Sequence, residues 1–97
     1  MKQLMILSSE EILDQVKRSI SHAQLGCYAE IGSAYGHHAK DLRFVETQEM
    51  TWPASMFVIL GEDEAVAGIV AELKQYAGSC DVKPCLQLIV TDVVDYY

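Results

Sequence analysis

Two adjacent histidines, His37 and His38, are the residues of this 97-residue chain best suited to holding a metal ion. Neutral imidazole is the commonest protein ligand for zinc, copper and nickel. Neighbouring side chains of an extended segment point to opposite sides, so one histidine of the pair would reach a given ion. Carboxylates and thiols elsewhere would have to complete the site, and the candidates are Asp41, Glu46, Glu49, Cys80 and Cys85.

The cysteines by themselves give a weak metal signal. Cys80 and Cys85 have C-x4-C spacing, which is less indicative of zinc than C-x2-C. With Cys27 they make three, an odd and small number that favours reduced thiols over a disulfide framework. We therefore predict free thiols, which are either buried or incidental, or contribute to the histidine site.

The glycines that precede the histidines could serve an anion instead. The stretch GSAYG, residues 32–36, can turn backbone N–H groups toward a negative charge. It opens no helix, however, and matches neither the dinucleotide fingerprint nor the P-loop. Lys40 and Arg43 supply the only positive charge nearby, which keeps a nucleotide or a bicarbonate-type anion open as a ligand. A solvated polar loop would also account for the whole stretch.

Catalytic groups are not arranged in a recognisable set. Ser8, Ser9 and His22 lie in or beside a predicted helix, without the nucleophile, base and orienting group that covalent catalysis needs. We therefore expect no enzyme activity. The alternative from that class is a small enzyme subunit of the dimeric α+β barrel kind, with a catalytic His or Tyr between helices and sheet.

Composition and charge restrict the partners. Fourteen acids face seven Lys and Arg, giving a formal net charge of −7 and no basic cluster, so nucleic acid and anionic membranes are not expected partners. The N-terminal MKQLMILSSEE resembles neither a signal peptide nor a membrane span, which predicts a cytoplasmic protein without membrane insertion. The length predicts one domain, residues 1–97.

Two strands and a helix are predicted in the first third of the chain. KQLMILS reads as a strand, and Ser8 with Glu11 forms a capping box ahead of a helix that Gly26 ends. The helix has apolar residues at helical spacing, namely Ile12, Leu13, Val16 and Ile20. The alternating CYAEI then predicts a second strand from Cys27 to about Gly32.

The same order recurs in the second half. SMFVILG, after Trp52 and Pro53, predicts a third strand, and CLQLIVTDVVDYY predicts a fourth. Between them a helix begins at about Asp63 and is closed by Gly78. Its apolar stripe consists of Val66, Ile69, Val70, Leu73 and Tyr76.

A βαββαβ order predicts the ferredoxin-like α+β fold, with a four-stranded antiparallel sheet in the order 4-1-3-2 and both helices on one face. Cys27 would then lie at one end of the sheet. At the other end lie Ser8, Ser9, His37, His38, Cys80 and Cys85. Because the second and fourth strands are opposite edges, roughly 14 Å apart, a site of histidines and cysteines would join two subunits. The face without helices would need a partner, and we expect Leu88, Val90 and Val94 to point there.

The predicted layout resembles the PII-like superfamily of small trimeric signalling proteins. The resemblance rests on the second strand ending in IGSAYGHH, a long excursion, and WPASMFVILGEDE returning as the third strand. It implies a trimer whose open sheet faces meet, ligand sites in clefts between subunits, and a mobile T-loop over about residues 32–52 that senses a small molecule or ion or contacts a protein. The corresponding ligand-binding residues are Gly32, Tyr35, Gly36, His37, His38, Lys40, Arg43 and Trp52.

The sequence departs from nitrogen-regulatory PII proteins in three ways. They carry a glycine-rich basic stretch before the fourth strand, where this chain has AGSCDVKPC with one lysine. They carry a modifiable tyrosine at the loop tip, whereas Tyr35 of this chain is near the loop base. They also carry a basic segment after the last strand, and the residues that follow the fourth strand here are not basic. We therefore do not expect ATP or ADP to bind in the usual mode. The CutA ion-tolerance proteins share the architecture, but none of their local sequence is present.

Three functions follow as hypotheses. The first is a non-enzymatic, trimeric PII-like regulator whose long loop responds to a small ligand or a partner. The second is a sensor or buffer for a divalent metal, built on His37 or His38 with Asp41, Cys80 or Cys85. The third is the small enzyme subunit described above. The identity of the ligand is not specified by any of these residues.

Overall fold

Burial alternates along β1 (Lys2–Ser9), because helices cover one face of the sheet and leave the other open. Leu4 and Ile6 are fully buried beneath the helices. Met5 and Leu7, on the opposite face, are half-buried. The computed structural model describes residues 1–23, 25, 27–37, 51–81 and 85–95, and of residues 33–37 and 51–52 it describes the backbone.

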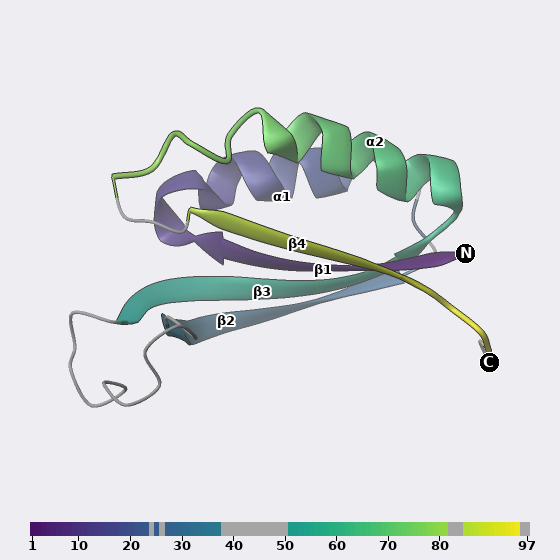
Figure 1. Ribbon diagram of the computed structural model, residues 1–97, viewed down its shortest axis with the longest axis horizontal. Helices are drawn as coiled ribbons and strands as arrows, with labels where there is room; N and C mark the ends of the chain where they lie inside the picture. The colour runs from purple at the N-terminus through teal and green to yellow at the C-terminus, as the bar shows by residue number, and fades with distance from the viewer. Residues whose placement is uncertain (24, 26, 38–50, 82–84, 96–97) are drawn as a thin grey trace.

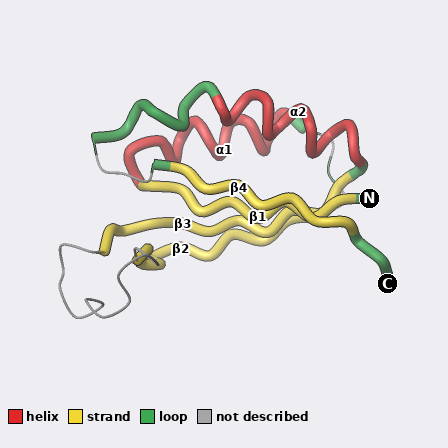
Figure 2. The backbone as a smooth tube through the Cα atoms, viewed as in Figure 1, coloured by secondary structure: helices red, strands yellow, loops and turns green. Residues whose placement is uncertain are grey.

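The sheet has four antiparallel strands in the order β2-β3-β1-β4, and both helices lie across one face of it (Figure 1; Figure 2). This is the predicted ferredoxin-like βαββαβ arrangement, since the order 2-3-1-4 is the order 4-1-3-2 read from the other edge. The remaining elements are η1 (Glu10–Ile12), α1 (Leu13–His22), β2 (Cys27–His37), β3 (Thr51–Gly61), α2 (Asp63–Lys74) and β4 (Leu86–Asp92).

The core lies between the helices and the covered face of the sheet. The predicted stripes are confirmed within the helices, although Tyr76 lies beyond the end of α2: Val16 and Ile20 of α1 are buried, as are Ile69 and Leu73 of α2. They pack against the inward side chains of the two central strands, and the full set of buried core residues is Leu4, Ile6, Ile12, Val16, Ile20, Phe57, Ile59, Val66, Ile69, Leu73, Cys80 and Cys85. No described helix is long and apolar enough to cross a membrane.

The cap of the first helical segment lies one residue later than predicted, and the α-helix itself begins at Leu13. Ser8 still belongs to β1, where it pairs with Ser55 of β3, and its Oγ donates to the carbonyl oxygen of Ser9. Ser9 is the cap, because its Oγ accepts a hydrogen bond of 3.3 Å from the backbone N–H of Glu11. The chain then makes the 3₁₀ turn of η1 before α1, which ends at His22.

Two strand boundaries also differ from prediction. β2 continues to His37 instead of ending near Gly32, because its backbone keeps pairing with β3 as far as Thr51. β4 stops at Asp92, since β1, its only partner among the described strands, begins at Lys2 opposite that residue. The β2–β3 pair therefore extends beyond the four-stranded part of the sheet as a two-stranded ribbon (Figure 2).

Candidate functional site

The predicted functional residues gather at one end of the sheet, where β1 ends and the β2–β3 ribbon leaves. Ser9 of β1 pairs with Ala54 of β3, and the ribbon continues from there to the pair His37 and Thr51. On the other side of β1, the backbone N–H of Ser9 donates to the carbonyl oxygen of Cys85 at 2.9 Å. The predicted common end is therefore confirmed for the described residues, and Cys27, paired with Leu60, lies at the opposite end.

Gly32 marks the base of the ribbon. Between the pairs Ile31–Met56 and Ala34–Ala54, β2 advances three residues while β3 advances two, so β2 contains a bulge at positions 32 and 33. A bulge increases the local twist and turns the strand out of the sheet plane. The space around Gly32 is open, since a Cβ added to this residue would meet nothing within 4 Å. The ribbon thus leaves the sheet at a local irregularity.

The ribbon contains the backbone of four residues that we predicted in the ligand-binding loop. Tyr35 pairs with Pro53, Gly36 with Trp52, and His37 with Thr51. The base of the predicted excursion is thus a paired ribbon and not an irregular loop. The other predicted residues lie outside the described part of the chain, namely His38, Lys40, Asp41, Arg43, Glu46 and Glu49.

The prediction of free thiols at the other connection is wrong. Cys80 and Cys85 form a disulfide in the segment between α2 and β4, with Cα atoms 5.3 Å apart. Both cysteines are buried, with 4% and 1% of their surfaces exposed, and both pack in the hydrophobic core. Cys27 is free and exposed. Sequence counting cannot reveal the pairing, because it depends on how closely the end of α2 approaches the start of β4.

The disulfide also changes the metal hypothesis. A sulfur atom in a disulfide is not a thiolate, and thiolate is the form of cysteine that binds metals. Cys80 and Cys85 are therefore not ligands in this oxidised state, contrary to their predicted role. Within the described residues no group of three or more His, Cys, Asp or Glu side chains is arranged to hold a metal ion.

The segment that carries the disulfide is hydrogen-bonded to the start of the first helix. The backbone N–H of Asp81 donates to Oε2 of Glu11 in η1 at 3.0 Å. Together with the contact between Ser9 and Cys85, this places the α2–β4 connection against both β1 and η1. The carboxylates near this connection make this end of the described structure acidic. They would repel an anionic ligand that approached it.

The open face of the sheet is not covered by either helix. Its side chains alternate with those of the core, and the middle row crosses the sheet as Ala29, Val58, Met5 and Ile89. On one side lies the row Ile31, Met56, Leu7 and Gln87, and on the other the row Cys27, Leu60, Gln3 and Thr91. Ile31 and Ile89, at the two edges, are 47% and 55% exposed. No charged residue occurs among these twelve.

The membership of this open face differs from prediction in β4. Val90 pairs with the buried Leu4, and Leu88 pairs with the buried Ile6, so both point toward the helices. Ile89 is the apolar residue of β4 on the open face. Val94 is 98% exposed but lies beyond the end of the strand. The need for a partner on this face stays a prediction, while the predicted residues of β4, Leu88 and Val90, are wrong by one position.

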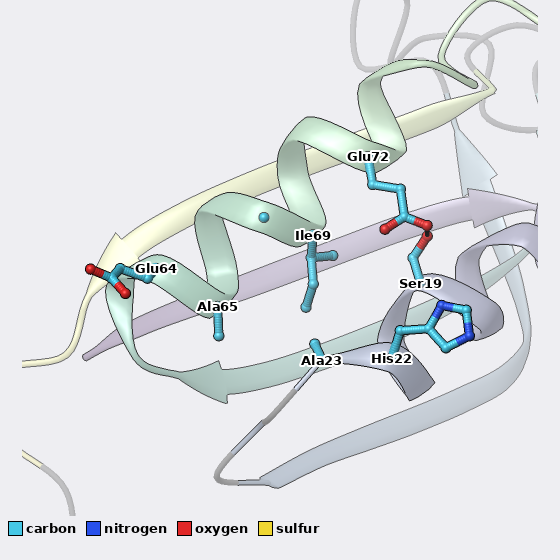
Figure 3. A pocket seen from close by; sticks show the side chains of 8 residues that line it. Ser19, His22, Ala23, Glu64, Ala65, Ile69 and Glu72 are labelled. Carbon is cyan, nitrogen blue, oxygen red and sulfur yellow. Dashed lines mark hydrogen bonds between the residues drawn. The ribbon is translucent and has the colours of Figure 1, made fainter.

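Among the grooves that the described residues form on the helical side, two border α2. One, of about 260 Å³, runs between α1 and α2 and is bordered by Ser19, His22, Glu64 and Glu72 (Figure 3). Ser19 Oγ donates to Glu72 Oε1 at 2.8 Å, so these two polar groups satisfy one another. The enzyme hypothesis needs a cavity between the helices and the sheet. This groove lies instead on the outer side of the helix pair.

The second groove, of about 410 Å³, lies between α2 and β4. Val66 and Val70 of α2 and Val90 of β4 give it an apolar floor. Lys2 lies at its rim, where its ammonium group is hydrogen-bonded to Asp92. This hydrogen bond, followed by the charge of Lys2, holds the pKa of Asp92 below its ordinary value. The groove was not predicted from the sequence, because Val66 and Val70 were assigned to the apolar stripe of the helix and Val90 to the open face.

No protein-family model and no curated protein matches the chain, but solved structures match its fold. CPII, a nitrogen regulatory PII-like protein from Thiomonas intermedia K12 solved bound to ADP, AMP and bicarbonate, matches with a TM-score of 0.69 at 13% identity. The match covers 95% of this chain and 88% of that chain. The apo form of the same protein gives a TM-score of 0.67 at 14% identity, over 95% and 87%.

A DUF3240 family protein from Shewanella baltica OS155 matches over a still larger share. Its TM-score is 0.65 at 16% identity, covering 99% of this chain and 93% of that chain. At such identities the likeness establishes the fold. The resemblance to the PII-like superfamily that the sequence predicted is therefore confirmed as a shared fold over nearly the whole chain.

Proposed function

We propose that this chain is a non-enzymatic PII-like regulatory protein that assembles as a trimer and senses a small ligand in the clefts between subunits. The observation that carries the proposal is the open sheet face, whose middle row of Ala29, Val58, Met5 and Ile89 is apolar from one edge of the sheet to the other. Monomeric proteins seldom expose continuous apolar patches of this kind, and such patches mark interaction sites. The PII-like fold supports the same assignment.

Burial of the open face would supply the free energy for assembly. Removing an isoleucine or methionine side chain from water contributes roughly 1.5–3 kcal/mol. Ile31 and Ile89 at the edges and Met5 in the centre could each gain part of this in an oligomer. The absence of charge from the twelve residues of the face means that no ion has to be desolvated when copies meet.

A closed ring would also bring the β2–β3 ribbon of one subunit close to the α2–β4 connection of the next. β2 and β4 are opposite edges of the sheet, so head-to-tail packing in a ring sets one copy's β2 edge beside the next copy's β4 edge. The ribbon of β2 and β3 would then approach the α2–β4 connection of a neighbour. A ligand bound there would contact two subunits, and the segment between His37 and Thr51 would respond to it.

The ligand class is the next part of the proposal. The Thiomonas protein was solved with ADP, AMP and bicarbonate, which makes these the first compounds to examine with this chain. The described residues near the site include the acidic Glu10, Glu11 and Asp81. A highly charged anion would therefore depend for compensation on Lys40 and Arg43 and on Lys83 of the α2–β4 connection.

Static light scattering and a thermal-shift screen test the two halves of the proposal. The purified protein should have three times the 10.8 kDa mass of one chain. A ligand that binds the folded state must raise the melting temperature by mass action. A monomer or dimer at micromolar concentration would rule out the trimer. A trimer that none of the three compounds stabilises would instead reject this ligand class.

The hypothesis of a metal sensor is not favoured by an observation in the described residues. It can be examined in the same screen with zinc, copper and nickel. The double variant His37→Ala/His38→Ala serves as the control, because it removes the histidine ligands without touching the core. Equal stabilisation of the variant and the parent would exclude a histidine site.

A further inference from the structure

We propose that Cys80 and Cys85 form a reversible redox site, whose reduction by a dithiol releases the α2–β4 connection from β1 and η1 while the domain stays folded. The inference is independent of the ligand and the trimer proposed above. It rests on the position of the disulfide, on the contacts of the segment that carries it, and on the environment that the sulfur atoms would have as thiols.

The disulfide is buried, but it lies in the connection between α2 and β4, outside the helices and strands. The described residues between α2 and β4 belong to neither helix nor strand, since α2 ends at Lys74 and β4 begins at Leu86. Such connections open locally at a lower free energy than the strands and helices they join. A reductant can therefore reach the buried sulfurs through a local opening, without unfolding of the sheet.

The bond closes a short loop, so the fold does not depend on it. The two cysteines are five positions apart in the sequence. The stabilisation that a crosslink gains from restricting the unfolded chain grows with the length of the closed loop, and it is smallest for loops of this size. The remaining core residues come from η1, α1, α2, β1 and β3 and are untouched by reduction.

The surroundings of Cys80 and Cys85 also suit two free thiols. Cys85 Sγ lies 3.5 Å from the carbonyl oxygen of Tyr76, a distance at which a thiol S–H can donate. A disulfide sulfur has no proton to donate, so this contact becomes a hydrogen bond only after reduction. Both sulfurs lie among apolar side chains, and free cysteine behaves as a small apolar residue in such surroundings. Each redox form therefore has a satisfactory environment.

The contacts that depend on the disulfide are those of Asp81 and Cys85. The bond holds these residues together while the Asp81 N–H donates to Glu11 and the Cys85 carbonyl accepts from Ser9. Reduction removes the restraint between the two anchors. The Asp81 contact is exposed to solvent and should be lost first, which removes one hydrogen bond between the connection and η1.

The reaction is a thiol–disulfide exchange with a dithiol as co-reactant. One thiolate of the dithiol attacks a sulfur of the Cys80–Cys85 bond, which breaks as a mixed disulfide forms. The second thiol of the dithiol then displaces the remaining cysteine. Two electrons and two protons pass from the dithiol to the protein, leaving two cysteine thiols and an oxidised dithiol.

Native reduction of the full chain with dithiothreitol tests the proposal. Samples are quenched in acid, denatured and alkylated, and the thiols are counted by mass spectrometry, while circular dichroism follows the fold before quenching. We expect Cys80 and Cys85 to become alkylated at unchanged secondary structure, a melting temperature lower by about 5–15 °C, and full recovery on reoxidation. Amide exchange should rise at least tenfold at Asp81 and stay constant at Ile6.

Cys27→Ser is the matched control, because it removes the one free thiol and should respond as the parent does. Cys80→Ser/Cys85→Ser should exchange at Asp81 like the reduced parent and be insensitive to dithiothreitol. If that variant fails to fold, direct reduction of the parent still decides. A bond that is reduced only when the circular dichroism signal collapses, or unchanged exchange at Asp81 after reduction, would overturn the proposal.

Discussion

Ile89 and Val90 are consecutive residues of β4, yet they lie on opposite faces of the sheet. Ile89 pairs with Met5 on the open face, whereas Val90 pairs with Leu4 and borders the groove beside α2. Their exposed fractions are similar, at 55% and 45%. The two residues are therefore about equally exposed, but Ile89 belongs to the open face and Val90 to the helical side of the sheet.

This pair gives a direct test of the open face as the interface between subunits. We expect Ile89→Lys to abolish the trimer at micromolar concentration, because assembly would bury a charge among apolar side chains without a partner. The apparent dissociation constant should rise at least a hundredfold, as measured by light scattering or sedimentation over a dilution series.

Val90→Lys is the control, since it adds the same charge one residue away on the helical side. It should leave the trimer intact, because the lysine ammonium can remain in water while its methylene groups cover the groove. Dissociation by both variants to the same extent would indicate a loss of strand stability. Dissociation by Val90→Lys alone would place the interface on the helical side and reject the proposed one.

The sequence predicts the helices of this fold, but it does not predict which residues of β4 lie on which face of the sheet. The two helices were predicted well, because Val66, Ile69 and Leu73 recur with a period that only a helix has. β4 could not be oriented in the same way. Its central residues are apolar on both faces, and a period of two then gives no indication of which set is inside. The cross-strand register with Leu4 supplies that information.

The candidate site was predictable in its location and not in its chemistry. Topology alone brings the end of β1, the β2–β3 ribbon and the α2–β4 connection to one end of the sheet. The disulfide depends on the distance between Cys80 and Cys85, which their spacing does not determine. The bulge after Ile31 is likewise a matter of pairing, because GSAYG fits a loop or a twisted strand equally well.

The hydrogen bond between the two helices gives a prediction on stability. Ser19 is buried in α1, and its Oγ donates to Glu72 of α2 at 2.8 Å. Ser19→Ala should lower the free energy of unfolding by about 1 kcal/mol, the usual effect of losing such a bond. Urea denaturation measures it. Ser21→Ala is the control in the same helix: its exposed Oγ donates to the Arg18 carbonyl, and the change should be smaller than about 0.5 kcal/mol.

The ion pair at the rim of the α2–β4 groove predicts a dependence on pH. Lys2 lowers the pKa of Asp92, first through its hydrogen bond and then through its charge. The stability that the carboxylate adds is complete above its unfolded-state pKa, near pH 4, and is lost as the pH falls through the lower folded-state pKa. Titration of the carboxyl carbon by NMR should show this pKa rising toward the ordinary value in Lys2→Gln and in high salt. An unaltered titration in Lys2→Gln would contradict the assignment.

Two glycines, Gly68 in α2 and Gly61 just before it, give a prediction on stability in which the second serves as the control for the first. Gly68 lies in the interior of α2, and a Cβ added there would meet nothing within 4 Å. Gly68→Ala should raise the free energy of unfolding by about 0.5–1 kcal/mol, because alanine loses less backbone entropy in a helix. At Gly61, the end of β3, an added Cβ would lie 3.1 Å from Leu25 Cδ2, so that side chain would have to shift. We expect no gain from Gly61→Ala in the same urea experiment. If Gly61→Ala stabilised the protein as much as Gly68→Ala, restricted freedom of the unfolded chain would be the common cause, and the open space beside Gly68 would be irrelevant.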